Sequence, residues 1–222
     1  MLFRDRTQAG YRLAVRLQEV GEGGAFGGTG AAGGKPLVLA IPRGGVVVAA
    51  VVCELLGAPM DLALAQKIGA PQNPELAVAA VAPDGSVLLD QDLCHHLDVS
   101  PQYLEREREA RRLEIERRLR NYREDRPLPD LAGRRVIVVD DGVATGLTTA
   151  AALRWVVGLG PRRVILAVPV APLDTVERLK QECDKVVCLE TPEPFWAVGQ
   201  FYERFDQTTD REVVDLYRHH AE

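Results

Sequence analysis

Short apolar runs alternate with helix-like stretches along most of this chain, and this alternation constrains the fold more than any other sequence feature. Each run is rich in β-branched residues and bounded by glycine, proline or charge, as buried parallel strands usually are. Strands and helices in alternation predict an α/β fold, a mainly parallel twisted sheet flanked by helices. The predicted strands are Pro36–Ile41, Asp61–Gln66, Arg135–Val139, Arg163–Val168 and Lys185–Leu189, and the predicted helices are Gly45–Leu56, Leu147–Leu159 and Leu173–Cys183.

Five segments depart from this alternation within what we interpret as a single domain, 1–222. The first residues have the helical spacing of an amphipathic helix, and residues 21–34 contain eight glycines, which is typical of a flexible loop. An Asp-Gly turn joins Ala77–Ala82 to Ser86–Leu89 and predicts a hairpin. A charged helical insert, 91–126, follows with the helix Pro101–Arg123, and the segment 191–222 begins with a cluster of aromatic residues.

Composition narrows the classes of function. Hydrophobic residues make up 46% of the 222 and charged residues 27%, and no apolar run approaches the ~20 residues that span a bilayer. The net charge is −5, and the arginines of 106–126 alternate with glutamates, so neither a membrane nor a nucleic acid is an expected partner. Four cysteines without a CxxC pair suit reduced thiols, which favours a cytoplasmic location.

The most informative motif is RRVIVVDDGVATGLTT, in which a buried strand ends at Asp140 and Asp141. A loop rich in glycine and threonine follows and leads into a helix, so unpaired main-chain amides and the helix dipole favour a phosphate there. The two carboxylates would repel a phosphate but can accept hydrogen bonds from vicinal hydroxyls. The pattern therefore predicts a site for a phosphorylated sugar at the carboxyl edge of the sheet.

This segment resembles the signature of type I phosphoribosyltransferases: four apolar residues, two acids, then small residues ending in T-G-x-T. The resemblance extends from about Pro36 to Leu189 and implies binding of 5-phosphoribosyl-1-pyrophosphate (PRPP). It implies that Asp140 and Asp141 contact the ribose hydroxyls. It also implies that the 5′-phosphate is bound by Ala144, Thr145, Gly146, Leu147, Thr148 and Thr149.

The same resemblance places a pyrophosphate loop after the first strand, where Arg43 and Gly44 match it. In relatives this loop often contains a non-proline cis peptide, which would lie here between Pro42 and Gly44. Lys67, after the second predicted strand, could reach the pyrophosphate, and the loop Gly69–Pro74 that follows could close over the site. Mg²⁺ is the implied cofactor, bound chiefly by substrate oxygens and water rather than directly by the protein, with Glu75 a possible contact of its hydration shell.

The resemblance implies transfer of the phosphoribosyl group to a nitrogenous, nucleobase-like acceptor with release of pyrophosphate. A small hood would bind this acceptor; the insert 91–126 and the segment 191–222 are both candidates, and Trp196 could stack on a flat acceptor or belong to the core.

Ala144 stands where 6-oxopurine enzymes have an aspartate, which makes hypoxanthine or guanine less expected. His95, His96, His219 and His220 are interpreted as surface residues. A non-catalytic regulatory protein that binds PRPP or a nucleotide remains the alternative, and relatives suggest a homodimer.

Overall fold

The computed structural model describes residues 2–22 and 35–221, and most of the glycine-rich segment 21–34 lies outside them. Within the described residues, the centre is a five-stranded sheet in the order β2-β1-β6-β7-β8, and every neighbouring pair is parallel. This confirms the predicted α/β class. The strands are β1 (Leu37–Ala40), β2 (Met60–Leu62), β6 (Arg135–Val139), β7 (Arg163–Val170) and β8 (Lys185–Glu190).

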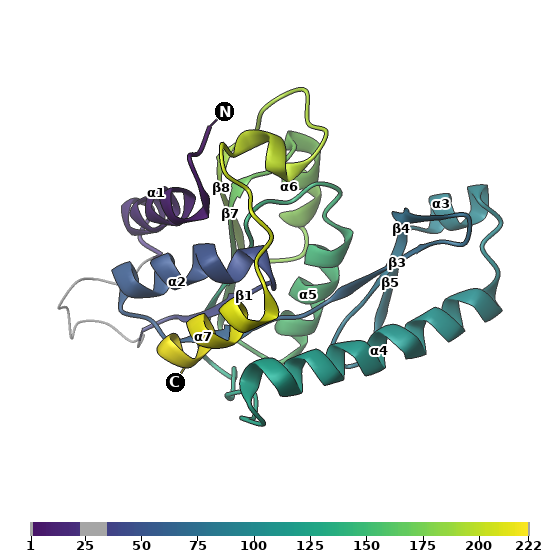
Figure 1. Cartoon of the computed structure of the whole chain (residues 1–222), viewed down its shortest axis with the longest axis horizontal. Coiled ribbons are helices and arrows are strands. Elements are labelled where there is room, and N and C mark those ends of the chain that lie inside the picture. Colours follow the sequence, from purple (N-terminus) through teal and green to yellow (C-terminus); the bar gives the residue numbers. More distant parts are fainter. Residues whose placement is uncertain (1, 23–34, 222) are drawn as a thin grey trace.

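Helices cover both faces of this sheet (Figure 1). Successive strand residues point to opposite faces, so Val38 and Ala40 join one hydrophobic cluster while Leu37 and Leu39 join the other. Burial on both faces explains why the strands are continuous apolar runs rather than alternating ones. One face carries α1 (Arg6–Glu19), α2 (Gly44–Leu56) and α7 (Asp210–His220), and the other carries α5 (Leu147–Gly158) and α6 (Leu173–Leu179).

A second, antiparallel sheet projects from the body as an arm (Figure 1). It contains β3 (Gln66–Ala70), β4 (Asn73–Val81) and β5 (Val87–Leu89), which confirms the hairpin predicted around the Asp-Gly turn. The short helix α3 (Gln91–His96) and the long helix α4 (Pro101–Arg123) follow, and α4 packs against β3 and α7.

The prediction of one strand over Asp61–Gln66 is wrong. β2 ends at Leu62, the chain crosses Ala63–Ala65, and β3 starts a different sheet at Gln66. The crossing residues are apolar and largely buried, so the sequence shows no break where the chain leaves the first sheet. The loop predicted over Gly69–Pro74 is mostly strand as well, because β3 and β4 pair as far as Ala70 and Asn73 with irregular register near Gly69.

Polar contacts hold α4 to both sheets. At its carboxyl end the Arg123 guanidinium lies 2.7 Å from the Asp61 carboxylate and donates to the Leu62 carbonyl at 2.8 Å, with both charged side chains under 10% exposed. At its other end the Tyr103 hydroxyl donates to the Gly69 carbonyl at 2.8 Å. The helix is therefore fixed in place despite its charged sequence. Among the residues described, no helix has both the length and the apolar character that a bilayer crossing requires.

Candidate functional site

The carboxyl ends of β1 and β6 bring two predicted motifs into contact. The Ile41 amide donates to the Val139 carbonyl at 2.8 Å, and the loop after β1 turns into α2 directly beside Asp140 and Asp141. The peptide bond Pro42–Arg43 is cis, as expected for this loop. A Cβ on Gly44 would lie only 1.8 Å from the Asp141 Oδ2 atom, so glycine is required for this approach.

The two aspartates form a close, largely desolvated pair. Asp140 Oδ1 accepts the Asp141 amide at 2.8 Å, and the Asp141 carbonyl accepts the Tyr202 hydroxyl at 2.6 Å. Burial, and then the neighbouring Asp141 charge, raise the pKa of Asp140 well above its usual value. Burial also raises the pKa of Asp141, but a guanidinium opposes this shift.

That guanidinium belongs to Arg6, which the sequence analysis did not identify. Arg6 Nε lies 2.7 Å from Asp141 Oδ2, and both side chains are nearly buried, at 11% and 13% exposure. The two residues are 135 positions apart, and an arginine in an amphipathic first helix carries no signal that it reaches the end of β6. The packing of α1 against α2, β7 and β8 brings them together.

The predicted phosphate loop opens α5. Gly146 precedes the helix with a φ of 78°, a left-handed conformation that glycine adopts without steric cost. Helix α6 fixes the loop from one side, because the Thr175 hydroxyl donates to the Ala144 carbonyl and Arg178 donates to the Thr145 carbonyl. Across the described part of the chain, no acceptor is found for the main-chain amides of residues 144–149. These amides are available to an anion.

The predicted phosphate-binding side chains differ in exposure. Ala144 and Thr145 are exposed, and Leu147 and Thr148 are half-buried. Thr149 is only 4% exposed, so its hydroxyl is less accessible than that of Thr145.

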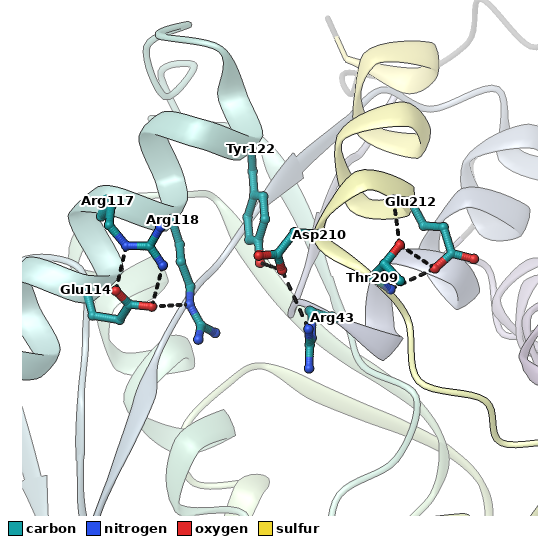
Figure 2. A network of polar contacts seen from close by, with 8 residues as sticks. All are labelled: Arg43, Glu114, Arg117, Arg118, Tyr122, Thr209, Asp210 and Glu212. Atoms are coloured by element: carbon teal, nitrogen blue, oxygen red, sulfur yellow. Dashed lines mark hydrogen bonds and ion pairs between the residues drawn. The ribbon is translucent and has the colours of Figure 1, made fainter.

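The predicted pyrophosphate residues point to different partners. Arg43 lies 3.7 Å from the Asp210 carboxylate of α7, which also accepts the Tyr122 hydroxyl of α4 at 2.6 Å (Figure 2). Lys67 is not at the end of a main-sheet strand but in β3, where it pairs with the exposed Glu75 at 2.8 Å. The sequence analysis therefore placed this lysine in the wrong sheet.

A cavity of about 700 Å³ lies between the arm and the first turn of α5. Three arginines of α4 line it, although the sequence analysis interpreted this stretch as a solvated helix face. That interpretation holds for part of the helix, where ion pairs three and four residues apart satisfy the charges. The charged and hydroxyl residues of the lining are Lys67, Glu75, Tyr103, Arg106, Glu107, Arg111, Arg118 and Thr148.

Trp196 does not belong to the core. It is 83% exposed, whereas Phe201 and Tyr202 from the same segment pack with Phe3 in a buried cluster. The surface interpretation of the histidines is wrong for His220, whose side chain is 8% exposed and whose Nδ1 lies 2.9 Å from the Leu216 carbonyl. The local sequence near the end of the chain did not indicate that His220 lies on the inner side of α7.

Trp196→Ala is expected to change the free energy of unfolding by no more than about 0.5 kcal/mol, because the exposed ring loses little packing. Phe201→Ala, at a position 7% exposed, is the matched control and is expected to lose about 3–5 kcal/mol. Urea unfolding of both variants measures this. A loss above about 1 kcal/mol in Trp196→Ala would return the ring to the core.

The described residues do not form a metal site by themselves. Within the part of the chain that the structure describes, no three His, Cys, Asp or Glu side chains gather closely enough to hold a metal ion. Glu75 offers a hard oxygen donor at the cavity, but its carboxylate is paired with Lys67.

Comparison with known proteins agrees with this geometry. Residues 27–206 match the family model described as the phosphoribosyl transferase domain. Two curated proteins from strains of Mycobacterium tuberculosis, whose names propose a phosphoribosyl transferase, are 40% identical over 96% of this chain. This chain spans 46% of their length.

Among solved structures, TT1426 from Thermus thermophilus is 42% identical and superposes over 100% of both chains with a TM-score of 0.79. The strand order, the acid pair at the end of β6 and the matched family model lead to one conclusion. The chain belongs to the phosphoribosyl transferase domain family.

Proposed function

We propose that the protein is a Mg²⁺-dependent phosphoribosyltransferase that moves the 5-phosphoribosyl group of PRPP to a nitrogenous, nucleobase-like acceptor. In this reaction the bond between C1 of the ribose and the pyrophosphate oxygen breaks, and pyrophosphate leaves with the electron pair. The acceptor nitrogen forms the new bond to C1 and loses its proton to solvent. The observation that supports the proposal most is the run of main-chain amides at 144–149, which have no acceptor among the described residues, beside two adjacent carboxylates.

The two halves of this site suit the two ends of a sugar phosphate. The amides at the start of α5 and the positive end of its dipole would hold the 5′-phosphate. Asp140 and Asp141 would accept hydrogen bonds from the ribose 2′ and 3′ hydroxyls, and such charge-assisted bonds fix the ring strongly. When the ribose ring is fixed and its C1 atom is accessible, the acceptor and the leaving group can lie on opposite sides of C1. This orientation lowers the entropic part of the activation free energy.

The departing pyrophosphate needs positive charge because the transition state separates an oxocarbenium-like ring from a polyanion. Arg43 and the main chain at Gly44 would contact it next to the acid pair, and Lys67 would do so from the arm. The cavity beside Thr148 has four cationic and two acidic lining residues, an excess of two positive charges that favours an anion there. Mg²⁺ would be carried by pyrophosphate oxygens and neutralise their charge, with Glu75 the protein's contact to its water shell.

Pyrophosphate release in the presence of PRPP, Mg²⁺ and a panel of nitrogenous bases tests this proposal. The expected result is release with one acceptor and none in samples that contain EDTA. Hypoxanthine and guanine are expected to be poor acceptors, because Ala144 supplies no carboxylate to take a base proton. PRPP binding without release for any acceptor would instead support a regulatory protein, and no PRPP binding at all would contradict both. The homodimer and the cytoplasmic location stay predictions.

A further inference from the structure

Three contacts hold the Arg6 guanidinium at the acid pair. Nε lies 2.7 Å from Asp141 Oδ2, and a terminal nitrogen donates to the Asp206 carbonyl at 2.7 Å. The Phe205 ring lies under the guanidinium carbon, 3.8 Å from it, in a cation–π arrangement. These partners come from the residues just after β6 and from the segment that precedes α7, so Arg6 is oriented from two sides.

The start of α1 is itself capped. The Asp5 carboxylate accepts the Gln8 amide at 2.9 Å and so caps the helix whose first residue is Arg6. On the opposite side of the ion pair, a Cβ at Gly44 would lie 2.8 Å from Arg6 Nε. The pair therefore lies against the main chain at Gly44, where no side chain separates it from the start of α2.

Negative charge is concentrated around Arg6, although Arg204, which pairs with Asp5, lines the same small hollow. Asp140 and Asp141 face Arg6 from the end of β6, the Tyr202 hydroxyl lies at the Asp141 carbonyl, and the Arg6 charge also reaches Glu212 of α7. The α2 side contributes Gly44, which carries no charge. Without Arg6, two neighbouring carboxylates would be desolvated together with no cation of the described residues bonded to either, and such a pair tends to hold a proton.

We propose that Arg6 is a positioning residue for the sugar diol: it keeps Asp141 ionised and fixed so that this carboxylate and Asp140 can accept the ribose hydroxyls. This inference rests on the proposed function. A protonated carboxyl would donate one hydrogen bond and lose part of its accepting capacity, which weakens its grip on a diol. Asp141 Oδ2 is already bonded to Arg6, so the diol relies on the other Asp141 oxygen and on Asp140.

Calorimetric titration with PRPP and Mg²⁺ from pH 5 to pH 8 tests the role of Arg6. In wild type, affinity is expected to fall as pH decreases and the acid pair takes up a proton. In Arg6→Gln this fall is expected about one pH unit higher, with roughly tenfold weaker binding in the shifted range. Arg6→Lys keeps the charge and is expected to keep the wild-type pH profile. It also carries the test if Arg6→Gln does not fold.

Arg12 provides a matched control on the same helix. It pairs with Glu190 at 2.6 Å, donates to the Leu2 carbonyl at 3.1 Å and lies over the Phe3 ring, but it does not contact the acid pair. Arg12→Gln should therefore loosen α1 comparably and leave the pH profile of PRPP binding unchanged. Equal profiles for Arg6→Gln, Arg12→Gln and wild type would overturn the inference, as would tighter binding by Arg6→Gln. A wild type that binds no PRPP would instead refute the proposed function.

Discussion

Asp140→Asn is expected to make the protein more stable at neutral pH while it removes most of the affinity for PRPP. Burial and the neighbouring Asp141 raise the pKa of Asp140 in the folded state, so the folded protein binds this proton more tightly than the unfolded chain does. The protonated Asp140 carboxyl therefore contributes its full stabilisation of the fold at low pH. This stabilisation is lost as the pH rises above the ordinary pKa of 3.8 and then through the raised pKa of the folded state. Asparagine has no charge to desolvate and escapes this loss.

Thermal unfolding between pH 4 and pH 7.5 measures the effect. Asp140→Asn is expected to melt about 2–4 °C above wild type at neutral pH, the shift that ~1 kcal/mol gives in a domain of this size. The difference should shrink toward pH 4, where the wild-type carboxyl is protonated. Asp174→Asn, whose side chain is 78% exposed, is the matched control and should follow wild type at every pH. A less stable Asp140→Asn at neutral pH would show that this carboxylate supports the fold.

Gly44→Ala is expected to destabilise the protein and to abolish PRPP binding, although glycine sits there at the first residue of a helix. Alanine favours helix formation by about 1 kcal/mol over glycine. At this position, however, its methyl group would overlap Asp141 Oδ2 and Arg6 Nε, and forced overpacking costs about 1–3 kcal/mol. The steric cost wins because the contacted atoms belong to a nearly buried ion pair.

Gly158→Ala in α5 is the matched control for this substitution. A Cβ there would meet nothing within 4 Å, so the same change is expected to be neutral or stabilising by up to about 1 kcal/mol. Urea unfolding and PRPP titration of both variants give the comparison. A Gly44→Ala variant that is as stable as Gly158→Ala and still binds PRPP would show that the loop and the acid pair are not in contact.

The features that could be predicted from the sequence are those that depend on residues close together along the chain. The strand Arg135–Val139 and the helix Pro101–Arg123 both follow from the local sequence pattern. The positions of Asp140 and Asp141 at the sheet edge follow from the strand that they end.

Other features depend on how distant segments pack, which local patterns do not encode. The ion pair of Arg6 with Asp141 joins the two sides of the site across 135 positions. Lys67 was assigned to the wrong sheet because an unbroken apolar run hides the passage from β2 to β3. The arginines that line the cavity look the same in sequence as those that face solvent, and only the position of β3 against α4 distinguishes them.

Sugar-phosphate titrations that differ by one hydroxyl test the central claim most directly. Wild type is expected to bind ribose 5-phosphate more tightly than 2-deoxyribose 5-phosphate, because only the first presents both hydroxyls to the acid pair. The Asp140→Asn, Asp141→Asn double variant is expected to bind the two sugars with similar affinity while still binding the phosphate. A wild type that does not distinguish them, or a double variant that still does, would contradict the assignment of these carboxylates to the ribose diol.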